Sequence, residues 1–355
     1  MMRRDFLKVL ALSALAGNLK TGISLAKEIF TPREVELIYS GNFPFQEKFL
    51  RLWIPLPMET SYQRVKSLEM KGSYSKSMLT KDPLYQSPIL YVEFPESSLK
   101  EIEVRMRIAL LGRKRVEIKK LEPNIKSLPE EVKLFLRPTE HIRTDGIVRE
   151  YAQRITKNKR TDLDKVRAIY DWVVENMYRD PQVKGCGVGD VARALETKTF
   201  GGKCTDINSM FVALCRASNI PARELFGLRV LPSELSKGIS NVKEDATKAQ
   251  HCRAEFWLNR WIPADPADVR KFILEEKVED FRDPKLMEVR RFMLGGWDNH
   301  WVLFNYGRDF SLVPPTTKGE TINEFMYPQA ELEGKLLDKL EVTFNYSKYT
   351  VKVIN

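Results

Sequence analysis

The sequence predicts an α+β protein in which an N-terminal β-sandwich precedes a mixed core of helices and strands. Residues 33–120 contain short strand-like segments without helical periodicity. Beyond Arg137, apolar residues recur at helical spacing, and strand-like segments return after Pro221. The 355 residues suffice for two domains of ordinary size.

The first 26 residues are typical of an export signal. Arg3 and Arg4 begin RRDFLK, which resembles the twin-arginine consensus; an apolar segment follows at 9–16, and 24–26 supplies small residues for cleavage. A disordered basic tail or a short anchoring helix is the alternative. Cleavage would lower the formal net charge from +10 to about +7, because this segment holds four cationic residues and one anionic residue. We therefore expect a periplasmic or otherwise extracytoplasmic protein.

Residues 27–122 form the predicted sandwich domain. Its segments are rich in β-branched and aromatic residues and are separated by Gly, Pro and Ser turns. They read EVELIYS, KFLRLWIPLP, RVKSLEM, ILYVEF and EIEVRMRIALL. Proline-containing linkers follow at 122–124 and 128–129.

Residues 135–315 form the predicted second domain. Helical spacing of apolar residues predicts helices over 144–156, 161–178, 190–195, 203–218 and 267–276. Strands are expected between the last two helices and at WVLFNYG. The remaining residues, 316–355, are interpreted as an extension ending in a β-hairpin over LEVTFNYSKYTVKVIN.

Composition limits the classes of function. With 43% hydrophobic and 30% charged residues, the sequence fits a globular protein, and no stretch approaches the ~20 apolar residues of a membrane span, so we expect no stable membrane insertion. Zinc-ligand spacings, GxGxxG and P-loop motifs are absent from the sequence, so we expect no cofactor and no metal. Export argues against nucleic acid as a partner. The basic charge then fits an acidic envelope polymer, an anionic membrane face or a merely solvated surface.

The segment GGKCTDINSMFVALCRASNIPAR points to a reactive thiol. Cys204 stands at the first turn of a predicted helix, where unpaired N–H groups and the macrodipole favour a thiolate. Gly201 and Gly202 should allow a sharp bend and leave room beside the sulfur, and Asn219 can end the helix in the left-handed region. A small buried hydrophobe is the other interpretation of a free cysteine, and we apply it to Cys215.

A thiol nucleophile needs a base, and the sequence offers His141, His251 and His300. Strand alternation in HCRAEFWL places His251 opposite the apolar face, at the start of a strand, and the chain returns to Asp265 after a turn at 259–260. A plain two-residue loop would place Asp265 on the wrong face. A Cys–His–Asp arrangement therefore requires the register of this hairpin to be one residue off.

These segments resemble the transglutaminase-like superfamily, which has a papain-like fold. Its pattern is a glycine-led cysteine on a helix ending in G-I-P-A-R, then His-x-W/R-x-E on one strand and W-x-P-x-D-P on the next. Cys204, His251 and Asp265 match the three catalytic positions, and Asn219 replaces the usual glycine before I-P-A-R. The match covers roughly residues 166–269. More weakly, the sandwich resembles N-terminal domains that bacterial members often carry.

The resemblance implies a cysteine acyl-transfer enzyme. His251 would deprotonate Cys204, which would attack an amide carbonyl and release an amine. Water would complete a peptidase or amidase reaction, towards which bacterial members lean, whereas a lysine-like amine would complete a transglutaminase reaction. A non-catalytic binding module and a thiol redox protein are further alternatives, against which the intact triad and the absence of CxxC argue.

The expected partner is a peptide or protein substrate, with peptidoglycan stem peptides as one candidate. The oligomeric state stays open. The Cys204 N–H should contribute to an oxyanion hole, with a second donor from Asn176, Tyr178 or Lys203. Cys186 and Cys252 are either a disulfide or two separate thiols.

Overall fold

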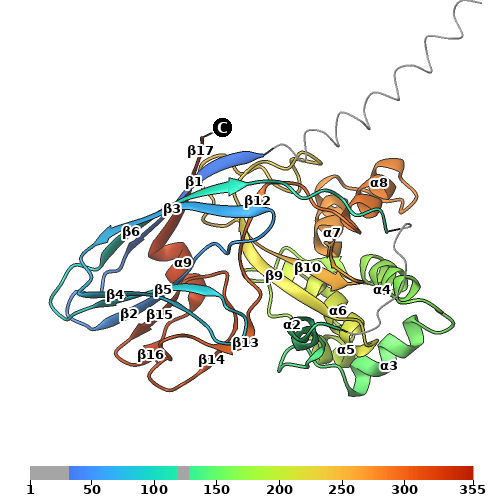
Figure 1. Cartoon of the computed structure of the whole chain (residues 1–355), viewed down its shortest axis with the longest axis horizontal. Helices are drawn as coiled ribbons and strands as arrows, with labels where there is room; N and C mark the ends of the chain where they lie inside the picture. Colours follow the sequence, from blue (N-terminus) through green and yellow to red (C-terminus); the bar gives the residue numbers. More distant parts are fainter. Residues whose placement is uncertain (1–31, 119–127, 355) are drawn as a thin grey trace, which may run out of the picture.

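The computed structural model describes residues 32–118 and 128–354. The predicted signal segment and the linker at 122–124 lie outside the described residues. The fold is α+β: a two-layered sandwich lies at one end of the molecule and most helices lie at the other (Figure 1). Within the described ranges, no helix has the length and apolar content needed to cross a bilayer.

The sandwich consists of two antiparallel sheets with strand orders β17-β1-β6-β3 and β16-β15-β2-β5-β4. Alternate residues of β1, such as Val35, Leu37 and Tyr39, are fully buried and share one core with Leu52 of β2 and Val92 of β5. The strands are β1 (Arg33–Asn42), β2 (Leu50–Pro55), β3 (Gln63–Gly72), β4 (Lys76–Lys81), β5 (Pro88–Phe94), β6 (Glu101–Leu110), β15 (Gln329–Leu332), β16 (Lys335–Leu336) and β17 (Ser347–Val353).

The prediction of a β-hairpin over residues 340–355 is wrong. Residues Lys339–Asn345 form helix α9, whose N-terminus is capped by the Asp338 carboxylate. Strand β17 then pairs along β1, from Val35 opposite Val353 to Gly41 opposite Ser347. The end of the chain therefore completes the N-terminal sandwich, as the red segment beside the blue strands in Figure 1 shows.

The helices expected between 144 and 276 are present with small differences at their ends. Thr161 caps α4 by accepting a hydrogen bond from the Asp164 N–H. Asp283 caps the unpredicted helix α8. The helices are α2 (Glu130–Lys133), α3 (Gly146–Ile155), α4 (Asp162–Asn176), α5 (Val191–Thr197), α6 (Cys204–Ala217), α7 (Pro266–Glu275) and α8 (Pro284–Met293), with a 3-10 turn at Leu134–Leu136.

A central sheet of order β11-β10-β9-β12 supports helix α6. The Phe211 ring meets Phe256 of β10 edge-on at 6.2 Å, and the Asn208 amide donates to the Cys252 carbonyl. The remaining strands are β7 (Tyr178–Arg179), β8 (Gly201–Gly202), β9 (Ala222–Arg229), β10 (Gln250–Trp257), β11 (Trp261–Ala264), β12 (Trp301–Asn305), β13 (Arg308–Ser311) and β14 (Thr321–Glu324).

Candidate active site

Cys204 is the first residue of helix α6, as the sequence predicts. Asp206 holds this helix start in place by accepting the backbone N–H groups of Lys203 at 2.8 Å, Val188 at 3.0 Å and Gly189 at 2.8 Å. The residue therefore acts as a helix-start acid that also anchors the neighbouring loop. At the other end, Asn219 adopts a φ of +64°, the left-handed conformation expected before Pro221.

The two glycines before Cys204 serve a different purpose from the one expected. They form strand β8 with φ outside the left-handed region, so they make no sharp bend. A Cβ on Gly202 would lie 2.5 Å from the Asp206 side chain, and one on Gly201 would lie 2.6 Å from the Tyr178 ring. The missing side chains at Gly201 and Gly202 make room for Asp206 and Tyr178, and they do not leave open space beside the sulfur.

The β10–β11 hairpin has the register that the candidate triad requires. Trp257 pairs with Trp261, so the loop has three residues, 258–260, with Asn259 at a φ of +61°. Ala254 pairs with Ala264, so Asp265 follows on the same face as His251. The one-residue offset is therefore confirmed.

The structure brings His251 and Asp265 into direct contact. His251 Nε2 lies 2.8 Å from Asp265 Oδ2, and both side chains are almost fully buried. Asp265 is also the N-cap of α7, where its Oδ1 accepts the Asp268 N–H at 3.1 Å and the Asn208 amide at 3.2 Å. These contacts hold the carboxylate in one orientation, so it can fix the orientation of the imidazole.

A second carboxylate, which has no counterpart among the predicted site residues, faces the same imidazole. Asp268 Oδ2 lies 3.3 Å from His251 Nε2, and its other oxygen pairs with the buried guanidinium of Arg229. The three-residue step from Asp265 to Asp268 spans one turn at the start of α7, which places both acids on one side of the helix. The three-residue spacing of the two acids in the sequence DPAD could have indicated Asp268 as a site residue.

The electrostatics of the site favour a thiolate and an imidazolium. Burial and Arg229 lower the pKa of His251, but Asp268 and Asp265 outweigh them and raise it to about 9. Burial raises the pKa of Cys204, but hydrogen bonds from Cys186 and His251 outweigh it and hold the pKa well below its usual range. Because Nε2 of His251 is bonded to Asp265, Nδ1 is the ring nitrogen left for the sulfur.

A family model matches the part of the chain that contains these residues. Residues 149–266, which contain Cys204, His251 and Asp265, match the family model of the transglutaminase-like superfamily. The chain belongs to the transglutaminase-like superfamily.

Relatives of known sequence or structure extend beyond the core. An uncharacterized protein of Haemophilus influenzae is 38% identical over an alignment of 318 residues, and the alignment covers 82% of this chain and 82% of that protein. The crystal structure of a candidate cysteine protease from Cytophaga hutchinsonii is 13% identical and shares the fold, with a TM-score of 0.55 over 91% of this chain and 98% of that one. The periplasmic domain of TgpA from Pseudomonas aeruginosa is 14% identical, with a TM-score of 0.36 over 74% of this chain and 95% of that one.

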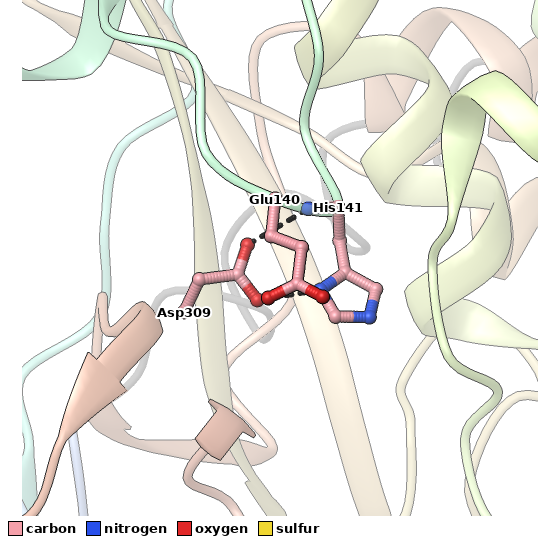
Figure 2. Close-up of side chains that lie close together, drawn as sticks. All are labelled: Glu140, His141 and Asp309. Carbon is pink, nitrogen blue, oxygen red and sulfur yellow. Dashed lines mark hydrogen bonds and ion pairs between the residues drawn. The ribbon is translucent and has the colours of Figure 1, made fainter. Parts of the chain in front are cut away.

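The other two histidines of this transglutaminase-like chain each contact a carboxylate away from Cys204. His300 Nδ1 contacts Asp298, whereas His141 Nδ1 lies 2.5 Å from Asp309, whose other oxygen accepts the His141 backbone N–H (Figure 2). The Glu140 side chain lies beside this second pair. Of the three histidines, His251 is the one that interacts with Cys204.

Two groups in the described ranges have ligand-type atoms within 4.8 Å of one another and could hold a metal ion. One is Glu140, His141 and Asp309; the other is His251, Asp265 and Asp268. In the second group the Arg229 guanidinium already pairs with a carboxylate and would repel a cation. The donor set of this transglutaminase-like core therefore suits proton transfer better than metal binding.

All four cysteines are free and buried, so Cys186 and Cys252 form no disulfide. Cys186 instead adjoins the site that contains Cys204. Its carbonyl accepts the Thr205 N–H at 2.9 Å, and its thiol lies 3.2 Å from the carbonyl of Gln250, the residue before His251. The sequence pattern predicts no role for this cysteine in the site, because only the folded chain brings residue 186 to α6.

The candidates for a second oxyanion donor differ in availability. The Asn176 amide donates to the Trp172 carbonyl within α4, and the Lys203 N–H donates to Asp206. Tyr178 is half exposed and packs on Gly201 beside the helix start. The Asn176 amide and the Lys203 backbone N–H therefore already have acceptors, whereas the Tyr178 side chain is half exposed beside the helix start.

Proposed function

We propose that this protein is an exported cysteine peptidase or amidase that cleaves peptide amides of the cell envelope through Cys204, His251 and Asp265. The observation that supports it best is the placement of Cys204 at the first turn of α6, with the buried His251–Asp265 pair beside it. The helix N-terminus stabilises the thiolate, and the two acids stabilise the imidazolium.

The proposed reaction has two steps. The Cys204 thiolate attacks the amide carbonyl and forms a C–S bond, while the His251 imidazolium donates its proton to the departing amine. The amine leaves as the C–N bond breaks, and a thioester remains. Water then attacks the thioester as His251 accepts one of its protons, the C–S bond breaks, and a carboxylic acid leaves while the Cys204 thiolate and the His251 imidazolium are restored.

The backbone N–H of Cys204 is the proposed oxyanion donor. The N–H groups of Lys203 and Thr205 on either side already donate to Asp206 and to the Cys186 carbonyl. An oxyanion at the helix start would also benefit from the macrodipole of α6. We propose the Tyr178 hydroxyl as the second donor.

The substrate assignment rests on export and charge. A mature chain of about +7 would meet the anionic, peptide-containing polymer of the bacterial envelope, so we propose peptidoglycan stem peptides and envelope proteins as substrates. Electrostatic attraction of this kind weakens at high salt because the Debye length falls from about 10 Å at 0.1 M to about 3 Å at 1 M.

The test incubates the mature protein with purified sacculi and, separately, with a mixed protein substrate at low and high salt. Cleavage that is lost in Cys204→Ser but kept in Cys215→Ser supports the proposal. Salt-insensitive cleavage of proteins without binding to sacculi would remove peptidoglycan from it. Ammonia release from a glutamine-containing protein, only when an amine is supplied, would move the enzyme to the crosslinking class.

A further inference from the structure

A cationic cavity of about 680 Å³ lies next to the candidate active site. Its walls come from the segment between β9 and β10, from α7 and from the C-terminal segment of α9 and β17. A cavity of this size holds a ligand of several residues.

Four cationic side chains line this cavity: Arg229, Lys248, Lys271 and Lys348. Asp245 is the acidic residue among the lining side chains, and Asp268 neutralises Arg229 from behind. The local balance of formal charge is therefore positive by two.

Arg229 adds a more specific observation. The side chain is 5% exposed, lines the cavity, and within the described ranges its Nε has no hydrogen-bond partner although Nη2 pairs with Asp268. A buried guanidinium N–H without an acceptor is costly, and a planar oxyanion is its natural partner. Lys271 adds a charge on the same wall; burial and Arg229 lower its pKa to about 8, so it is still mostly protonated at pH 7.

The cavity is connected to the site through a short chain of contacts. The backbone N–H of Arg229 donates to the backbone carbonyl of Ala249. Ala249 also lines the cavity and stands two positions before His251. Arg229 also pairs with Asp268, which lies 3.3 Å from the His251 imidazole. A group bound to Arg229 would therefore lie close to the residues proposed to act on the amide.

From this geometry we infer that the cavity is an acidic-peptide subsite, in which a carboxylate of the substrate pairs with Arg229, Lys271 and the two outer lysines. This inference rests on the proposed function and gives it a substrate class: peptides that carry a free carboxylate near the cleaved amide. Such a carboxylate can be a C-terminus, a side-chain acid or the free α-carboxyl of a γ-linked acid, and all three have the same chemistry.

The test uses three synthetic stem-type tetrapeptides, L-Ala-γ-D-Glu-L-Lys-D-Ala. One has both carboxylates free, one has an amidated C-terminus, and one has the α-carboxyl of the γ-linked glutamate amidated. Binding is measured by calorimetry with the Cys204→Ala variant, so that affinity is read without turnover. Amidation at the recognised carboxylate should weaken binding about tenfold or more, the effect of one charge-assisted hydrogen bond.

The same titrations with charge variants locate the subsite. Lys248→Gln and Lys348→Gln, both at the outer wall, should each weaken binding of the free peptide and reduce its advantage over the amidated peptide. Lys271→Met should do so more strongly, by about tenfold. Lys243→Gln changes an exposed lysine of the same segment that does not line the cavity, so it serves as the matched control.

Equal affinity for all three peptides, or equal effects of the Lys248 and Lys243 changes, would overturn the subsite. Failure of the proposed function looks different: the wild-type protein would bind the free peptide selectively yet cleave none of its amides. Cleavage without discrimination among the three peptides would leave the proposed function standing and remove the subsite.

Discussion

At the scale of single residues, the site depends on how two acids share one imidazole. Cys204, His251 and Asp265 could be selected as site candidates from the sequence, because each stands at the end of a recognisable helix or strand. Asp268 and Arg229 could not, because their roles arise from a helix start and a strand end that meet only in the folded chain.

The alkaline limit of activity tests the role of Asp268. In the proposed reaction the imidazolium of His251 is the proton donor, so kcat/KM should fall as pH rises through its pKa of about 9. Asp268 raises that pKa, so Asp268→Asn should move the alkaline limb to lower pH. Asp171→Asn removes an exposed acid that pairs with Arg290 and should leave the limb in place. An unmoved limb in Asp268→Asn would show that Asp268 has no electrostatic role.

Cys186 provides a second test at this scale. Its hydrogen bond lowers the pKa of Cys204, so Cys186→Ala should raise that pKa and move the acidic limb of Cys204 alkylation to higher pH. Cys215, on the same helix as Cys204, is its control, and Cys215→Ala should cause no shift. Identical profiles for wild type and Cys186→Ala would contradict the proposed role of the second thiol.

At the scale of elements, sequence periodicity predicts the helices around the site well, because each has an apolar stripe and because Thr161, Asp190 and Asp265 cap α4, α5 and α7. The register of β10 and β11 is harder to predict than the helices. The triad requires a one-residue offset, but the local sequence does not determine that offset. Loops of two and of three residues both fit LNRW; in the structure the loop has three residues, with Asn259 at a positive φ.

Asp206 should be the main stabiliser of the α6 start. Asp206→Ala leaves three backbone N–H groups without their charged acceptor, so we expect about 3 kcal/mol lower free energy of unfolding. Asp190→Ala removes the cap of the shorter helix α5, which accepts one N–H, and should cost about 1 kcal/mol. Denaturant titration measures both. Equal losses would mean that Asp206 is an ordinary cap.

At the scale of the whole molecule, the order of segments along the chain differs from their order in space. Strand β17 completes one sheet of the sandwich and β15 extends the other, so the C-terminal segment folds onto the N-terminal strands. The alternation in SKYTVKV indicates a strand, but nothing local identifies β1 as its partner, because a pairing between the two ends of the chain leaves no short-range signal.

Strand β17 should therefore contribute to global stability. Val351 is fully buried between the sheets whereas Val353 is 52% exposed on the same strand. Val351→Lys places a charge in the core and should lower the free energy of unfolding by several kcal/mol, about 3 or more, whereas Val353→Lys should change it by less than about 0.5 kcal/mol. Unfolding curves of the two variants that coincide would show that β17 is dispensable.

The central claim is that Cys204 is an activated nucleophile paired with His251. Its most direct test is a short pulse of iodoacetamide at pH 6, followed by whole-protein and peptide mass spectrometry. We expect Cys204 to be labelled ahead of the other three cysteines, and His251→Ala to abolish that preference. Labelling of Cys186 or Cys215 ahead of Cys204, or an unchanged preference in His251→Ala, would contradict the claim.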